Sequence, residues 1–168
     1  MSLVIEDGSI VVNADSYVSR SDFIAYASAV GVTVADEAAT DVHLRKAFDF
    51  INSKEPNIKG RRVNRTQLGS FPRYDLWIEG FAWLSSEIPR QVINAQCELA
   101  LDLISGIDIY NPPQSESTGI KRERIEGVVD VTYAVAEGSK VSRRSLSRAH
   151  MNTFLKNGGL LSVEIGLG

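Results

Sequence analysis

A basic run at positions 59–73 holds the residues with the clearest capacity for chemistry. Its sequence, KGRRVNRTQLGSFPR, contains five cations and no acid, and aromatic residues follow at once in YDLWIEGFAW. A basic groove combined with aromatic platforms is what proteins use to bind single-stranded nucleic acid. Arginine and large aromatic residues are also enriched at the centres of protein–protein interfaces. The run therefore allows two interpretations.

The charge distribution favours the protein-interface interpretation. The formal net charge is −3 and the pI is about 5.4, whereas a dedicated DNA-binding domain is usually strongly basic. Residues 1–58 carry nine acids and four bases, and residues 120–148 carry seven bases and four acids. Opposed acidic and basic surfaces are typical of proteins that self-associate. We expect the arginines to pair with acids of a neighbouring copy.

The predicted interface has three sets of residues. The basic loop supplies Lys59, Arg61, Arg62, Arg65 and Arg73, and the acidic face opposite it supplies Asp36, Asp41 and Asp49. The aromatic anchors, which would hold the long loop against the body or a neighbour, are Phe71, Trp77, Phe81 and Trp83. In the nucleic-acid interpretation the same arginines would contact phosphates and the aromatic rings would stack on bases.

No group of residues predicts catalysis. His43 and His150 lie far apart on predicted helices, and one cysteine without HxxxH or CxxC spacing predicts no zinc site. Cys97 is expected to be a small buried residue. Glu98 and Asp102, four positions apart on a helix, are expected on a solvated face or opposite a neighbour's arginines. We therefore predict no enzyme, no cofactor and no metal.

Four helices are predicted to position these residues. The first follows Ser19 or Ser21 as N-cap and stops at Gly31. The third begins with Pro89 in its first position and shows the strongest helical periodicity. The predicted ranges are about 20–30, 36–53, 89–106 and 143–156.

Extended structure is predicted near both ends of the chain. LVIED and IVVNA are expected to form short strands joined by Asp7-Gly8. IKRERIEGVVDVTYAV, from residue 120, is also expected to be extended, and the apolar tail LLSVEIGLG is β-prone. The stretch 56–87 is too long for a plain connection, so we expect a functional, interfacial or ordered excursion there.

The predicted fold class is mainly α. It is a small bundle of about four helices with a long irregular loop, an extended β appendage and a C-terminal tail. Residues 1–110 would form the core with the inserted loop 56–87, and residues 111–168 would complete the same single domain with a linker, extended segment, short helix and docking tail. No apolar stretch reaches the roughly 20 residues of a membrane span, and no signal peptide is evident. We expect a soluble protein of a reducing cytoplasm.

Four blocks in order resemble a tailed-phage protein family. They are EDGS with NADSYVS, LRKAFDFINSK, KGRRVNRTQLGSFPR and SSEIPRQVINAQCELAL, all within about residues 3–105. Phe71 stands where that family generally has tryptophan, which keeps an aromatic ring before Pro72. The family is often labelled DnaT-like single-stranded DNA-binding protein, and it also resembles the head–tail connector (adaptor) proteins that form a ring beneath the portal.

The connector function is the one that we favour from the resemblance and the charge pattern together. It implies a structural virion protein, made in the bacterial cytoplasm and located at the neck, that forms a homo-oligomeric ring of about twelve copies. The ring would contact the portal protein and a further connector or tail-completion protein, and double-stranded DNA would pass through it without sequence-specific contacts or any membrane. Portal or neighbour docking is assigned to Leu160, Leu161, Val163 and Ile165. The alternative is a single-stranded DNA-binding protein of phage replication.

Overall fold

The helices of the computed structural model begin and end close to their local sequence signals. The model describes residues 2–110 and 144–156. Helix α1 (Arg20–Ala29) is capped by Ser19, whose hydroxyl accepts the backbone N–H of Asp22 at 3.1 Å. Gly31 follows it with φ +77°, a left-handed conformation that suits glycine. The predicted first helix is thereby confirmed at both ends.

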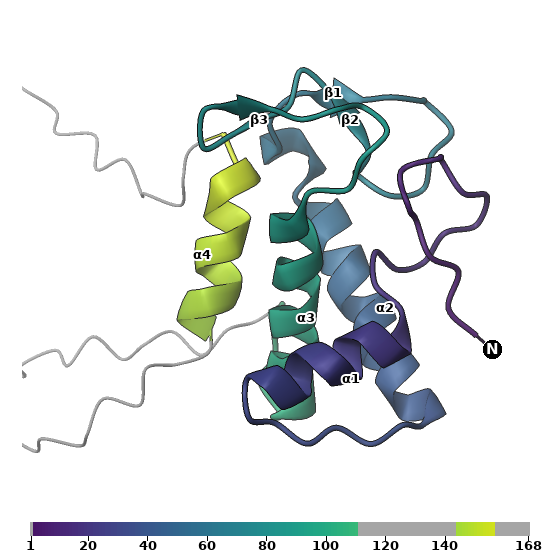
Figure 1. Ribbon diagram of the computed structural model, residues 1–168, viewed down its shortest axis with the longest axis vertical. Coiled ribbons are helices and arrows are strands. Elements are labelled where there is room, and N and C mark those ends of the chain that lie inside the picture. Colours follow the sequence, from purple (N-terminus) through teal and green to yellow (C-terminus); the bar gives the residue numbers. More distant parts are fainter. Residues whose placement is uncertain (1, 111–143, 157–168) are drawn as a thin grey trace, which may run out of the picture.

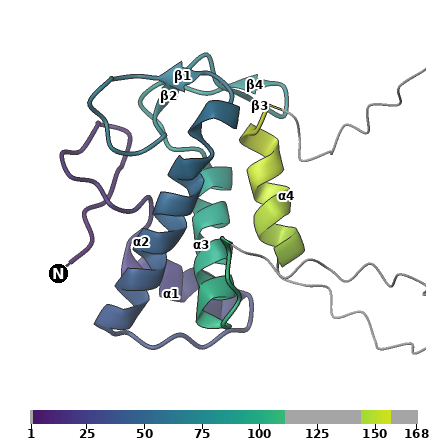
Figure 2. The same cartoon turned by 180° about the vertical axis from the view of Figure 1, so that it is seen from behind.

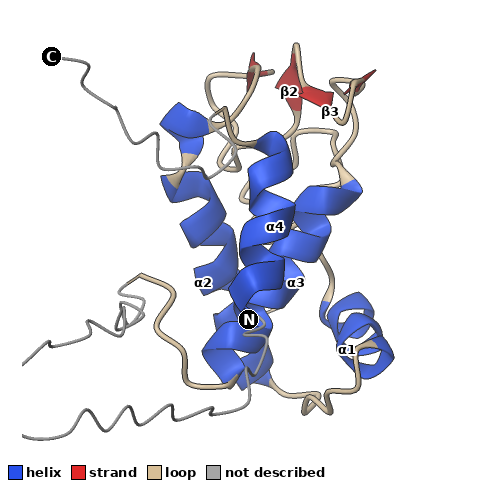
Figure 3. Ribbon diagram, turned by 90° about the vertical axis from the view of Figure 1, so that its left-hand side faces the viewer, coloured by secondary structure: helices blue, strands red, loops and turns tan. Residues whose placement is uncertain are grey.

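Three further helices complete the bundle: α2 (Ala38–Ser53), α3 (Arg90–Ile104) and α4 (Arg144–Phe154). Pro89 occupies the N-cap position of α3, one residue before the expected place. Helix α3 is central because α1, α2 and α4 all pack against it. Figure 2 shows α2 and α4 on either side of α3, Figure 1 shows α1 lying across one end of the bundle, and Figure 3 shows α1 nearly end-on. The fold is mainly α, as predicted.

Two small hairpins lie across the other end of the bundle (Figure 1). A 3₁₀ turn (η1, Glu55–Asn57) leads into β1 (Arg61–Arg62), which pairs antiparallel with β2 (Arg73–Tyr74). Strand β3 (Trp77–Ile78) pairs with β4 (Phe81–Ala82) in the same way. We call residues 55–83 the cap. The long stretch after α2 is therefore an ordered excursion and carries a β appendage within the described residues.

The N-terminal strands that we predicted do not form. Ile5 and Ser16 make a single parallel bridge, and the chain between them is a loop. The buried carboxylate of Glu6 organises this loop by accepting the backbone N–H groups of Gly8, Ile10 and Val11 at 2.9–3.0 Å. These N–H groups cannot then join a strand ladder, because each already has an acceptor.

The expectation that Glu98 and Asp102 lie on a solvated face is wrong. Both side chains are 1% exposed, because α3 is covered by its three neighbours. The hydroxyl of Tyr26 on α1 donates to Glu98 Oε1 at 2.7 Å, and that of Ser147 on α4 donates to Asp102 Oδ2 at 3.2 Å. The two carboxylates therefore join the helices of the bundle.

The predicted linker 111–119, extended segment 120–136 and tail 160–168, including the docking residues Leu160, Leu161, Val163 and Ile165, lie outside the described residues. Within the described residues, no helix combines the length and apolar character needed to cross a bilayer.

Candidate nucleic-acid interface

Arg73 is the structural centre of the cap. Its side chain is 3% exposed and donates to the carbonyl oxygens of Lys59, Gly60 and Ser70 at 2.7–2.9 Å. Its Nη1 also lies 2.8 Å from Oε1 of Glu55. Four of the five N–H groups of the guanidinium therefore have acceptors in its own chain. Arg73 is inside the molecule and not on a surface that a second subunit or a DNA strand could contact.

Two more cations of the basic run are engaged within the chain. Arg62 is half-buried, with Nε 3.3 Å from Glu55 Oε1 and Nη1 donating to the carbonyl of Gln67. Lys59 Nζ donates to the carbonyl of Thr153 at 2.8 Å, which ties the cap to the end of α4. These contacts hold the run against the bundle.

Glu55 was not among the residues singled out from the sequence, although it neutralises two of the arginines. Burial alone would raise the pKa of its carboxyl group, but hydrogen bonding and the positive charges of Arg73 and Arg62 outweigh burial and lower that pKa. The carboxylate is therefore ionised at neutral pH and offsets part of the positive charge of the run. No pattern in the sequence marks Glu55, because it lies 18 positions before Arg73.

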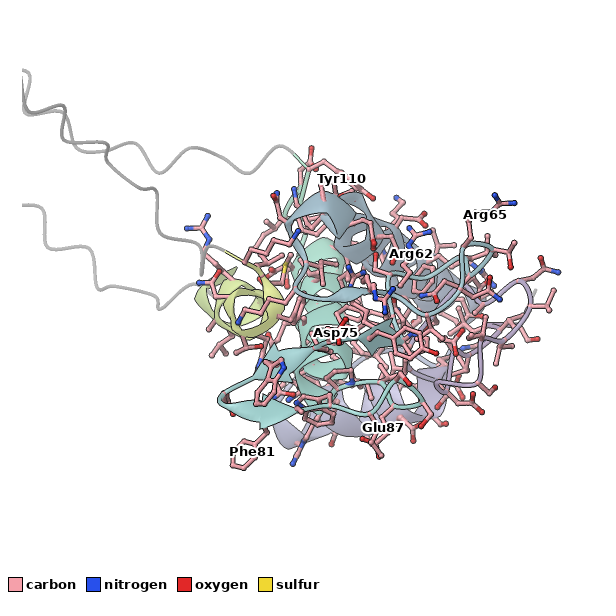
Figure 4. All side chains as sticks on the ribbon, turned by 90° about the horizontal axis from the view of Figure 1, so that it is seen from above. Arg62, Arg65, Asp75, Phe81, Glu87 and Tyr110 are labelled. Carbon is pink, nitrogen blue, oxygen red and sulfur yellow. The ribbon has the colours of Figure 1, made fainter. Side chains whose placement is uncertain are left out.

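Arg61 and Arg65 are the cations of the run that remain exposed to solvent. Arg61 lies over the ring of Tyr74, 5.4 Å from its centroid, and makes an exposed ion pair with Asp75 at 3.3 Å. An exposed pair of this kind contributes little to stability. Arg65 makes no ion pair or hydrogen bond with the described part of the chain. Figure 4 shows Arg65 at the periphery of the cap, pointing into solvent.

Two of the three predicted acidic partners are engaged elsewhere. Arg20 donates to both carboxylate oxygens of Asp41, at 2.7 and 2.8 Å, and to Asp36 at 3.0 Å. The hydrogen bond from Arg20 lowers the pKa of the buried Asp41. Asp49 is exposed on α2 and makes no ion pair with the described residues. Asp36 and Asp41 therefore already have a cation of their own chain as partner.

The four predicted aromatic anchors divide into two groups. Phe71 is fully buried, with its ring against Tyr17 and Phe154 at centroid distances of 6.0 and 5.5 Å, and it holds the cap on the bundle. Trp83 is partly buried against the same core. Phe71 precedes a cis proline, Pro72.

Trp77 and Phe81 do not anchor the cap to the body. Their side chains are 58% and 74% exposed, although they lie on paired strands β3 and β4. Tyr74, on β2, is 42% exposed. Large aromatic residues bury most of their area when they serve only the core, so these three rings are available to another molecule. Figure 4 shows Phe81 projecting from the edge of the cap.

We call the exposed side chains of Arg61, Arg65, Tyr74, Trp77 and Phe81 the cap surface. It combines rings on which bases can stack with Arg61, which lies over the ring of Tyr74, and with Arg65 at a separate edge of the cap. It is not a strongly positive groove, because Lys59, Arg62 and Arg73 are engaged internally and Asp75 lies beside Arg61. Stacking, more than phosphate contact, is the chemistry that this surface offers.

The other residues considered from the sequence, Cys97, His43 and His150, lie outside the cap surface. The described ranges contain no group of three or more His, Cys, Asp or Glu side chains that could hold a metal ion. Cys97 is buried, as expected, and burial raises the pKa of its thiol to about 12. His43 and His150 lie on different helices, α2 and α4.

Comparison with known proteins supplies a family. The family described as "Putative DnaT-like ssDNA binding protein" matches residues 1–167, well beyond the blocks that carry the resemblance in the sequence. This description agrees with the alternative, DNA-binding interpretation better than with a head–tail connector. No curated protein and no solved structure matches the chain. Because the match covers nearly every residue, the chain belongs to this DnaT-like family.

Proposed function

We propose that the chain binds single-stranded DNA through the cap surface. The observation that carries the proposal is the exposure of three aromatic rings, Tyr74, Trp77 and Phe81, on two adjoining hairpins of an otherwise well-packed domain. Unpaired bases stack on such rings, and each stacked base contributes about 1–3 kcal/mol to binding. The family description supports the same ligand.

The arginines of the cap surface set the electrostatic character of this binding. Arg61 and Arg65 are the exposed cations of the basic run. Each phosphate neutralised on a single strand lowers the slope of log K against log salt by about 0.7, so two contacts predict a slope of about −1.4. If all five cations of the run contacted phosphates, the slope of log K against log salt concentration would be about −3.5 by the same rule. The salt dependence of the affinity thus distinguishes binding by base stacking from binding by phosphate contacts.

The test is fluorescence anisotropy with a labelled oligothymidine, compared with a duplex of equal length over a salt series. Trp77→Ala and Phe81→Ala should each weaken single-strand binding about 5- to 150-fold, the equivalent of one lost stacking contact. Tyr110→Ala is the matched control, because Tyr110 is an aromatic residue of similar exposure, 52%, outside the cap. Absence of oligonucleotide binding by the wild type, or full affinity in both cap variants, would refute the proposal.

A second candidate function is the head–tail connector subunit. The observation in its favour is that Lys59, Arg62 and Arg73 are engaged by their own chain, which leaves few cations to hold DNA. Exposed tryptophan and phenylalanine are then docking residues for protein, as at interface hot spots. Mass spectrometry of purified virions decides between the two: a stoichiometric structural component supports the connector, whereas absence from virions removes it.

A further inference from the structure

A groove of about 540 Å³ lies beside the cap, between the N-terminal loop and the turn that follows β4. Ile5, Trp83, Ile88 and Ile93 line it together with the acidic residues Asp7 and Glu87, and the buried Glu6 and Tyr17 complete the lining. The two acidic residues are exposed, while the four apolar ones are partly buried. The groove therefore combines an apolar interior with a negative rim.

The walls of the groove are held in place by close backbone contact. Gly8 has φ +104°, and a Cβ atom at that position would lie 2.1 Å from the carbonyl oxygen of Ser86. Only glycine allows the loop to approach the turn this closely. The buried Glu6 carboxylate fixes the same loop from inside. The groove is thus part of the folded structure and need not be formed by a ligand.

No cation is among the described residues that line the groove. Neither Asp7 nor Glu87 makes an ion pair with the described residues. Ser9 donates hydrogen bonds to Asp7 that lower the pKa of this carboxyl group, so it is ionised at neutral pH. A partner that places an apolar side chain in the interior and a cation at the rim would satisfy both features.

The loop at residues 64–68 of this same chain has these two groups. Leu68 is 55% exposed, and Arg65, three positions earlier, is an exposed cation without a described partner. The loop is also held in shape, since Gln67 accepts the N–H of Asn64 and donates to the carbonyls of Gly69 and Pro72. A preordered loop loses less conformational entropy on docking.

We infer that the 64–68 loop of one copy docks in the groove of a second copy, with Leu68 against the apolar interior and Arg65 between Asp7 and Glu87. Arg65 and Glu87 point to different sides of the molecule in Figure 4. The contact is therefore head-to-tail, and a pair of copies keeps one free groove and one free loop, on different copies. This pairing replaces Asp36 and Asp41, which Arg20 already occupies, as the acidic partner of the basic loop.

The inference goes beyond DNA binding and uses a different acidic and apolar surface, and it shares only Arg65 with the cap surface. Sedimentation velocity over a concentration series up to the order of 100 µM tests it. The wild type should associate, and Arg65→Glu or Glu87→Arg should each weaken association at least about 10-fold by placing like charges together. The double variant restores an opposite-charge pair and should recover part of the loss.

Leu68→Ser provides an independent variant for the apolar half of the contact, and it too should weaken association. All three positions altered here are exposed, so the thermal midpoint should stay unchanged, which separates lost docking from lost folding. A wild type that remains monomeric, or a double variant no better than the weaker single one, would overturn the inference. Glu87 and Leu68 do not belong to the cap surface, so the oligonucleotide affinity of Glu87→Arg and of Leu68→Ser should stay at the wild-type value. These two variants therefore test association separately from the proposed function, whereas Arg65→Glu alters a residue of both contacts.

Discussion

Arg73→Ala is expected to destabilise the fold strongly, although Arg73 belongs to the run that looks most like a DNA-binding segment. The substitution removes four donors at once from Glu55 and from three backbone carbonyls. Removing one partner of a buried ion pair costs about 3–5 kcal/mol. The Glu55 side chain is 27% exposed and can regain water, so we expect the low end, about 3 kcal/mol. For a chain of this size that is a fall of about 6–12 °C in Tm.

Urea unfolding at pH 7, followed by circular dichroism and by tryptophan fluorescence, measures this loss directly. Arg65→Ala is the matched control from the same run, and it should change the free energy of unfolding by no more than about 0.5 kcal/mol. Arg73→Lys should fall between, because lysine keeps the charge but cannot donate in several fixed directions. A loss below about 1 kcal/mol for Arg73→Ala, or equal losses for both alanine variants, would refute the assignment of Arg73 to the interior.

Three further outcomes follow from particular contacts. Arg20 lowers the pKa of Asp41, so the stability that this pair contributes is complete above the unfolded pKa near 4 and is lost as pH falls through the folded pKa. Asp41→Asn should lose about 1–3 kcal/mol of unfolding free energy at pH 7. Urea titrations at several acidic pH values should show that its unfolding free energy depends less steeply on pH than that of the wild type, and equal slopes would contradict this. Gly60→Ala should lower Tm more than Gly106→Ala, since both have positive φ but only the Cβ at Gly60 would meet a backbone oxygen, at 2.2 Å. Cys97 should react with a thiol reagent at pH 8 only at the rate of unfolding, because burial raises its pKa to about 12; reaction as fast as a free thiol would argue against its burial.

The residue types of the sequence predicted which segment holds the cap surface, but they did not predict which of its side chains are exposed. The sequence indicated that a basic and aromatic segment was the place to look, and it predicted both a nucleic-acid and a protein interpretation. It placed Trp77 and Phe81 among the anchors, whereas the structure buries Phe71 and leaves those two exposed. All three are large and apolar, so type alone does not distinguish the ring that meets the core from the ring that meets solvent.

The sequence by itself determined the elements whose free energy depends on near neighbours. Ser19 and Gly31 bound α1, and apolar periodicity marked α2 and α3, because capping and amphipathicity act within one or two helical turns.

Only the tertiary structure decided which arginine is buried and stabilises the cap and which is exposed and can contact another molecule. Arg73 and Arg65 have the same chemistry, and they differ because pairing of β1 with β2 brings Arg73 to the carbonyls of residues 59–60 and to Glu55. Burial of a charged side chain depends on what distant segments place around it, and that information is absent from the run itself.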